Sequence, residues 1–198
     1  MWLKNLMLGF LLVAVGGCST SANDDDSSSV DSSTPEPTLT IDWDDCGGNI
    51  GDHGCDFTFN DQNDDPWNLY EHHGSIIVLD FSAMWCYYCT VAAADVQAVQ
   101  DMYADDDFIW VTILIDDAAG NAPDLNDIQE WANTYGIETS PVLMGNRDII
   151  DTSAEDGYPV SSWPTFVILD RDLVIRFGLR GWNQQTVLNE IQKAIDEE

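Results

Sequence analysis

The sequence predicts an α/β domain in which a central mixed β-sheet is flanked by helices and preceded by a small β-hairpin. Apolar runs of buried-strand length alternate with patterns that repeat every three or four residues, in the order β-α-β-α-β-β-α after the hairpin. Turn residues separate these segments. Hydrophobic residues make up 44% of the chain, which is enough to form a core despite the strong acidity.

A short hairpin opens the predicted domain. Phe57-Thr58-Phe59 alternates apolar and polar side chains, residues 61–66 contain turn formers, and Trp67 and Leu69 alternate again. Short apolar runs then predict four strands, at residues 75–81, 108–115, 165–169 and 173–177. The last two flank a turn at 170–172, so we expect them to pair as a hairpin.

Three helices are predicted between and after these strands. They are placed at residues 89–104, 124–135 and 186–195. The second has Leu125, Ile128 and Trp131 on one stripe and ends at Gly136, a residue type that commonly terminates helices. Each helix has apolar side chains at spacings of three and four residues, so each should pack against the sheet.

The first seventeen residues resemble a secretory signal rather than part of a fold. Residues 1–17 combine one Lys4, no acidic residue and an apolar run too short to cross a bilayer permanently. The ending Val15-Gly16-Gly17-Cys18 resembles the bacterial lipobox, in which the cysteine is lipidated. The alternative is an ordinary signal followed by a chance cysteine. By resemblance to lipoprotein sorting, Ser19 favours the periplasmic side of the outer membrane.

Residues 18–40 form the predicted link between this anchor and the domain. They are rich in Ser, Thr, Asp and Pro and contain almost nothing to bury. We therefore expect a disordered, acidic tether after the lipidated Cys18. The predicted domain occupies residues 41–198.

The chain is strongly acidic, with 36 Asp and Glu, 6 Lys and Arg, and a formal net charge of −30 at pH 7. Nucleic acid is excluded as a general partner, because binding to its phosphates needs a basic surface. Short Asp clusters are spread along the domain, but none has the alternating spacing of a calcium loop. We therefore predict a solvated acidic surface, and no bound metal or other cofactor.

Trp85-Cys86-Tyr87-Tyr88-Cys89 lies where a predicted buried strand passes into a helix. The start of a helix carries free N–H groups and a partial positive charge, which lower the pKa of a thiol placed there. Cys86 lies at the helix start, where it can be exposed, and Cys89 lies one turn along. Cys86 is therefore the expected nucleophile, and Cys89 the thiol that resolves the mixed disulfide.

Residues 78–89, Val-Leu-Asp-Phe-Ser-Ala-Met-Trp-Cys-x-x-Cys, resemble the strand–turn–helix signature of thioredoxins, and residues 163–170 resemble the family's second signature. The resemblance covers about 57–195 and implies a thioredoxin fold. It also implies that Pro164 has a cis peptide bond, faces the CxxC and presents backbone groups that hold the substrate as a strand. The predicted anchor and hairpin resemble the TlpA/ResA-type lipoprotein branch.

The same resemblance implies roles for two more residues. Asp80 occupies the place of a buried acid behind the CxxC, where desolvation should raise its pKa and allow it to accept the proton of Cys89. The alternative is an Asp that is exposed or merely structural. Trp85 should pack beside Cys86 and limit the access of water, and with Pro164 it should help to dock the substrate.

Three features of the sequence depart from the family pattern. Tyr87-Tyr88 separates the cysteines in place of the Gly-Pro of thioredoxins, and no histidine lies between them. Thr112 stands where thioredoxins carry a lysine near the buried acid, so the proton relay should be weaker. Trp163 precedes the proline where many relatives have a smaller side chain, and it should restrict which disulfides can dock.

Cys46 and Cys55 also need an assignment. A four-cysteine zinc site shared with the CxxC is disfavoured, because eight residues separate this pair and zinc pairs usually have two to four between them. A structural disulfide in an oxidising compartment is favoured, although sequence alone leaves other pairings open.

These features predict a membrane-anchored thiol–disulfide oxidoreductase of the cell envelope. The favoured version is a reductase of client protein disulfides that receives electrons from a membrane thiol–disulfide partner. The alternatives are an oxidase or isomerase, and a non-catalytic binding module whose CxxC is a static disulfide. A thiol peroxidase is disfavoured, because Ala83 lies three residues before Cys86, where peroxiredoxins have Thr or Ser.

Overall fold

The structure is a computed structural model that describes residues 41 and 43–197. The predicted signal at 1–17, the lipidation site Cys18 and the tether at 18–40 lie outside the described residues and stay predictions. Within the described part of the chain, no helix is long and apolar enough to cross a membrane.

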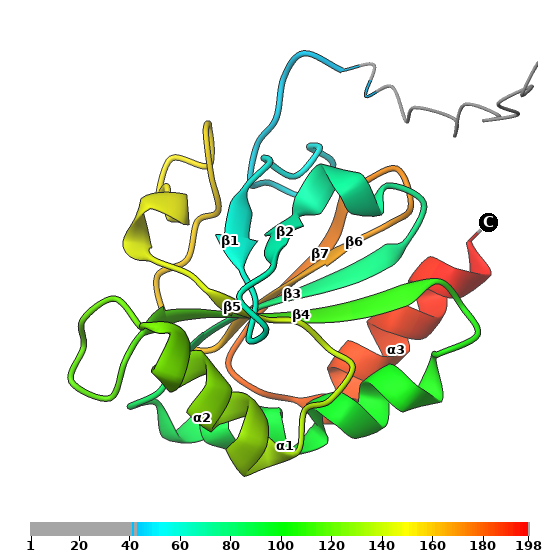
Figure 1. Cartoon of the computed structure of the whole chain (residues 1–198). Helices are drawn as coiled ribbons and strands as arrows, with labels where there is room; N and C mark the ends of the chain where they lie inside the picture. The colour runs from blue at the N-terminus through cyan, green and yellow to red at the C-terminus, as the bar shows by residue number, and fades with distance from the viewer. Residues whose placement is uncertain (1–40, 42, 198) are drawn as a thin grey trace, which may run out of the picture. The chain divides into compact units, whose positions relative to one another are not determined.

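A five-stranded mixed sheet forms the centre of the domain, in the spatial order β5-β4-β3-β6-β7 (Figure 1). The strands are β3 (Ile76–Ala83), β4 (Phe108–Asp116), β5 (Val142–Met144), β6 (Thr165–Leu169) and β7 (Ile175–Arg180). β4 is parallel to both β3 and β5, while β6 pairs antiparallel with both β3 and β7. β3 is buried along its whole length, because it lies in the middle of the sheet with both faces covered.

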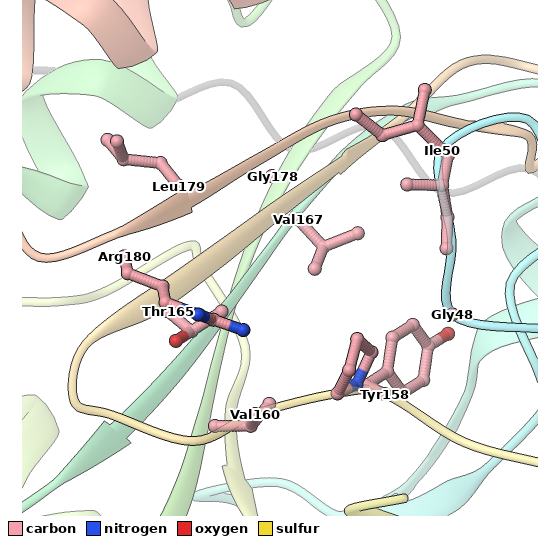
Figure 2. Close-up of a pocket in the computed structure, with 11 residues that line it drawn as sticks. Gly48, Ile50, Tyr158, Val160, Thr165, Val167, Gly178, Leu179 and Arg180 are labelled. Atoms are coloured by element: carbon pink, nitrogen blue, oxygen red, sulfur yellow. The ribbon is translucent and has the colours of Figure 1, made fainter. Parts of the chain in front are cut away.

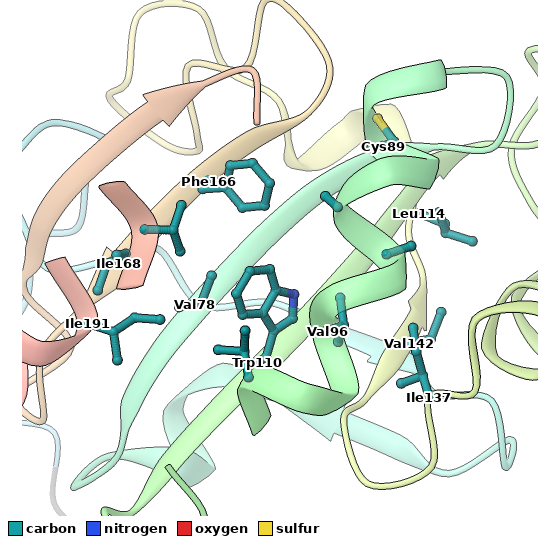
Figure 3. Close-up of a cluster of buried hydrophobic side chains, with 14 of the residues drawn as sticks. Val78, Cys89, Val96, Trp110, Leu114, Ile137, Val142, Phe166, Ile168 and Ile191 are labelled. Carbon is teal, nitrogen blue, oxygen red and sulfur yellow. The ribbon is translucent and has the colours of Figure 1, made fainter. Parts of the chain in front are cut away.

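Three helices pack with one face of this sheet (Figure 1). They are α1 (Tyr87–Met102), α2 (Leu125–Tyr135) and α3 (Gln184–Asp196). Their apolar side chains join those of the sheet in one buried cluster, in which Trp110 of β4 lies between α1 and the strands (Figure 3). Local signals set the ends of α2: the Asp124 carboxylate accepts two backbone N–H groups at its start, and Gly136 terminates it with a φ of 64°.

A hairpin and irregular segments cover the other face. The hairpin consists of β1 (Thr58–Asn60) and β2 (Pro66–Asn68), and a 3₁₀ helix over Leu69–His72 follows it. Trp67 and Tyr158 pack in a second buried cluster on this face. The Tyr158 hydroxyl donates to the carbonyl of Cys55 at 2.9 Å, which ties this layer to the start of the domain. The mixed sheet, flanking helices and N-terminal hairpin are therefore confirmed.

Three elements show the clearest differences from the sequence prediction. The sequence does not predict β5, because three residues are too few for a periodic pattern and pairing with β4 is what forms it. α1 begins at Tyr87 rather than at 89, because Cys86 itself caps the helix. β7 begins at Ile175 rather than at 173, because Leu173 has a φ of 59° and belongs to the turn.

Candidate active site

β3 ends directly in front of the CxxC. Its last residue is followed by Met84 and Trp85, and Cys86 is the N-cap of α1. The Cys86 sulfur accepts a hydrogen bond from the backbone N–H of Cys89, with 3.2 Å between the nitrogen and the sulfur. The first turn of α1 contains no acidic residue. A thiolate on Cys86 would therefore be stabilised by the helix N-terminus without a competing carboxylate in that turn.

Cys86 and Cys89 are joined by a disulfide, with their Cα atoms 5.2 Å apart. Cys89 is fully buried, and Cys86 is only 7% exposed, which is less open than its place at the helix start suggests. The flanking aromatic side chains are much more exposed, with Trp85 at 50% and Tyr87 at 74%. Cys86 is nevertheless the more exposed cysteine of the pair.

Pro164 immediately precedes β6, and the peptide bond between Trp163 and Pro164 is cis. Thr165 lies opposite Phe81 of β3. Pro164 is therefore beside the end of β3 from which the CxxC segment leaves. Among the described residues, no hydrogen bond uses the backbone N–H or C=O of Trp163. These two groups are available to pair with an extended peptide.

Asp80 is completely buried in β3. Burial removes the hydration of its charged form and raises the pKa from 3.8 to about 7. Hydrogen bonds oppose this shift: the Ser82 hydroxyl donates at 2.6 Å and the Thr112 hydroxyl at 3.4 Å. The indole of Trp110 also lowers the pKa, although its Nε1–H makes no regular hydrogen bond in the described part of the chain. Desolvation is the largest effect, so Asp80 titrates near neutral pH.

The register of β3 and β4 places Asp80 on the face covered by helices. Asp80 lies opposite Thr112, and Val78 and Trp110 lie one step back on the same face, in the cluster that includes α1. Cys89 belongs to the same cluster. The structure therefore brings the carboxyl group and the inner cysteine into one buried layer between the sheet and α1.

Asp116 and Arg147 belong to the site, although sequence patterns assign them no role. Asp116 ends β4 with 1% exposure and accepts a hydrogen bond from the Trp85 indole Nε1–H at 3.2 Å. Arg147 donates to both oxygens of this carboxylate, through Nε at 3.0 Å and Nη2 at 2.5 Å. An acid at the end of an apolar run is a signal that could have singled out Asp116. No local pattern marks Arg147, which lies 31 residues further along.

The structure pairs Cys46 with Cys55 in a second disulfide, with 4.8 Å between their Cα atoms. This is the pairing that the sequence favours. All four cysteines of the domain are thus joined in two separate disulfides, which does not match the alternative of a shared zinc site. In the range 43–197, no group of three or more His, Cys, Asp or Glu side chains could hold a metal ion.

Replacing both Cys46 and Cys55 by serine should destabilise the domain by about 2–3 kcal/mol, because the unfolded chain gains the freedom of a ten-residue loop. Redox turnover should be nearly unchanged. Urea unfolding and a disulfide-reduction assay on the same protein check both statements. A loss of turnover in a protein that remains folded would instead place this pair in the catalytic machinery.

A cavity of about 380 Å³ lies on the face of the sheet opposite the three helices (Figure 2). It is lined mainly by apolar groups from β6, β7 and the loops above them, among them Ile50, Tyr158 and Val167. Tyr158 and Val167 belong to the second buried cluster, whereas the CxxC cysteines belong to the first. The sheet therefore separates this cavity from the CxxC.

The fold and the site together define a class of protein. A CxxC at the start of a helix that follows the central strand, a cis-proline directly before the neighbouring strand and a buried acid beneath the helix form the arrangement of thioredoxin-like thiol–disulfide oxidoreductases. A sequence model of the AhpC/TSA family matches residues 50–177, and the chain belongs to this family. It is a thiol–disulfide oxidoreductase with a Cys86–Cys89 disulfide.

Solved structures with the same fold come from several bacteria. A thiol:disulfide interchange protein from Chlorobium tepidum is 20% identical and has a TM-score of 0.60, over 78% of this chain and 99% of that one. The exposed lipoprotein thioredoxin of Streptococcus pneumoniae is 19% identical with a TM-score of 0.57, over 70% and 99%. A secreted Mycobacterium tuberculosis disulfide oxidoreductase is 19% identical with a TM-score of 0.54, over 69% and 95%.

These likenesses confirm the thioredoxin-like fold, and at such identities they show the fold alone. No curated protein sequence matches this chain.

Proposed function

We propose that the protein is a lipid-anchored reductase of disulfides in client proteins of the cell envelope. The observation that carries this proposal is the state of Asp80. Its buried carboxyl group has a pKa of about 7 and lies in the same layer as Cys89. A carboxylate in this state can accept the proton of a resolving thiol near neutral pH. When the dithiol gives its electrons to a client, Cys89 releases this proton, so a base in the same buried layer assists the step.

The first step is attack by Cys86. Its thiolate attacks one sulfur of the client disulfide, the client S–S bond breaks, and one client sulfur leaves as a thiolate. The product is a mixed disulfide between Cys86 and the client. The helix N-terminus and the N–H of Cys89 favour the thiolate form of Cys86.

The second step is resolution by Cys89. Its thiol gives its proton to the Asp80 carboxylate, and the resulting thiolate attacks the Cys86 sulfur of the mixed disulfide. The second client sulfur leaves as a thiolate, and Cys86 and Cys89 become the disulfide. The client has then gained two electrons, and both of them came from the Cys86–Cys89 dithiol.

Client docking is assigned to the segment before β6. The free backbone N–H and C=O of Trp163 can pair with an extended client segment, which the cis-Pro164 turn would hold next to Cys86. The half-exposed Trp85 provides apolar contact area on the other side of the nucleophile. For a further cycle, a thiol–disulfide partner in the membrane would reduce the Cys86–Cys89 disulfide.

The envelope location is proposed from three observations. Residues 1–17 and Cys18 resemble a lipoprotein signal, and lipid on Cys18 would hold the domain at the membrane. The Cys46–Cys55 disulfide suits an oxidising compartment. Two proteins of the same fold are named as an exposed lipoprotein and a secreted oxidoreductase.

The reduction potential of the Cys86–Cys89 pair tests the direction of transfer. Titration with glutathione or dithiothreitol, with Cys46 and Cys55 intact, should give a value near or below roughly −250 mV, as for thioredoxin. A value near about −120 mV would instead identify an oxidase. If the pair fails to titrate, the disulfide is static and the reductase proposal is wrong.

A further inference from the structure

The two tryptophans that flank the redox site are connected through one arginine. Trp85 immediately precedes Cys86, and Trp163 immediately precedes the cis-proline. The Trp85 indole donates to the Asp116 carboxylate, which also accepts both hydrogen bonds from Arg147. The guanidinium carbon of Arg147 lies 6.0 Å from the centre of the Trp163 ring. The connection therefore runs from Trp85 through Asp116 and Arg147 to Trp163.

We propose that Arg147 is a positioning residue that holds Trp85 and Trp163, the two tryptophans that flank the redox site, at a fixed separation for the docking of a client disulfide. This inference rests on the proposed reaction with protein disulfides. Arg147 acts through the tryptophans rather than on the reacting sulfurs. Its effect should therefore fall on the binding of protein clients, which are large enough to contact both rings, and not on small disulfides.

The chemistry of the arginine side chain explains why one residue can make both contacts. A guanidinium is planar, so its Nε and Nη2 can bond two carboxylate oxygens while its face covers an aromatic ring. An ammonium group is a compact charge and cannot do both in this geometry. The Asp116 carboxylate is buried, whereas 62% of the Arg147 side chain is exposed. The ion pair thus connects the buried carboxylate of Asp116 to the surface at which a client would dock.

The Trp85 ring depends most on such support. Trp85 is half exposed, so packing alone does not hold its ring, and its one polar hydrogen is directed to Asp116. Asp116 in turn is a buried acid whose charge Arg147 balances. Basic residues are scarce in this protein, since the whole chain has only 6 Lys and Arg against 36 Asp and Glu. Loss of Arg147 should remove one contact of the Trp163 ring, which also packs against both buried clusters, and should weaken the hold of Asp116 on Trp85.

The test uses two variants, because Arg147→Met alone would leave a buried carboxylate without its partner and could unfold the domain. Arg147→Lys keeps a positive charge for Asp116 but loses the planar contact. The double variant Arg147→Met/Asp116→Asn removes both charges while the amide oxygen can still accept the Trp85 indole. Arg176→Met is the matched control. Arg176 is also an exposed arginine, but it lies on β7 and forms its ion pairs with Asp170 and Glu197.

The substrates are insulin, as a protein disulfide, and bis(2-hydroxyethyl) disulfide, as a small one. Both Arg147 variants should raise KM for insulin about two- to fivefold, the size expected for a lost cation–π contact at an exposed site, with kcat nearly unchanged. Turnover of the small disulfide should stay within about twofold of the wild type. Arg176→Met should behave as the wild type with both substrates.

A second readout does not depend on activity. In protein labelled with 5-fluorotryptophan, the ¹⁹F signal of Trp163, assigned with Trp163→Phe, should shift in both variants. The signal of Trp85 should shift less than that of Trp163 in both variants, because each keeps an oxygen at position 116 that accepts its indole N–H.

An unchanged KM for insulin in both folded variants would overturn the proposal. Equal losses with both substrates would also overturn it, since they would place Arg147 in the sulfur chemistry. If the wild type reduces neither disulfide, the proposed function fails. The part of the proposal that concerns client binding then fails with it. The ¹⁹F shifts still report whether Arg147 fixes the positions of the Trp85 and Trp163 rings.

Discussion

Replacing Cys86 by serine should abolish turnover, leaving only the uncatalysed exchange between the client and the reductant. A serine hydroxyl stays protonated at neutral pH and does not attack a disulfide, so no mixed disulfide can form. Cys89→Ser should behave differently. Cys86 can still attack, but nothing resolves the product, so a mixed disulfide with the client should accumulate and be visible on a non-reducing gel.

Turnover rather than stability separates an enzyme from a binding module in the Cys86→Ser variant. The variant loses a small disulfide ring, which should cost about 2 kcal/mol relative to the oxidised wild type. Relative to the reduced wild type, its free energy of unfolding should be almost unchanged. The Cys46→Ser/Cys55→Ser variant is the matched control, because it loses a disulfide of the same domain and should keep turnover. Turnover that survives in Cys86→Ser would place the nucleophile elsewhere.

Replacing Asp80 by asparagine should slow resolution about 100-fold, which is the lower end of the range for loss of a general base. The initial attack by Cys86 should be nearly unaffected, because the proton of Cys89 has not yet moved. In the wild type, the resolution rate should rise as the pH passes through about 7, where the Asp80 carboxyl loses its proton. Asp80→Asn should lack this rise. Stopped-flow single-turnover measurements separate the two steps, and equal slowing of both would contradict the role of Asp80.

Asp80→Asn should also stabilise the domain, and more so at higher pH. The folded-state pKa of Asp80, about 7, is above its unfolded value of 3.8, so the unfolded state releases this proton first. The wild type therefore loses stability as the pH rises from about 4 to 7, and the neutral amide does not. The gain in the free energy of unfolding should be about 2 kcal/mol at pH 5.5 and about 4 kcal/mol at pH 8.

Urea unfolding of the reduced proteins at both pH values checks this gain. Asn keeps an oxygen that can accept the Ser82 hydroxyl, so the substitution preserves the closest contact of the carboxyl group. Ser82→Ala is a useful companion, because it removes that hydrogen bond and should raise the pKa of Asp80 further. No pH-dependent gain in Asp80→Asn would mean that the carboxyl is ionised in the folded state throughout this range, so that burial does not raise its pKa.

Sequence alone predicts most of the fold and the redox pair. Strand and helix patterns are local, so the order of elements follows from periodicity in the printed sequence. The CxxC is a local signal too, because its chemistry requires only two cysteines at the first turn of a helix. β5 is missed because its three residues carry no period of their own and are held by pairing with β4.

Tertiary structure decides the properties that depend on distant residues. The pKa of Asp80 depends on its full burial and on hydroxyls that include Thr112, 32 residues away. The pairing of Cys46 with Cys55 is one of several that the sequence allows, and folding selects it. Arg147 meets Asp116 only because the segment after β5 returns to the end of β4. Sequence patterns report local geometry, whereas desolvation and charge pairing depend on which distant groups the fold brings together.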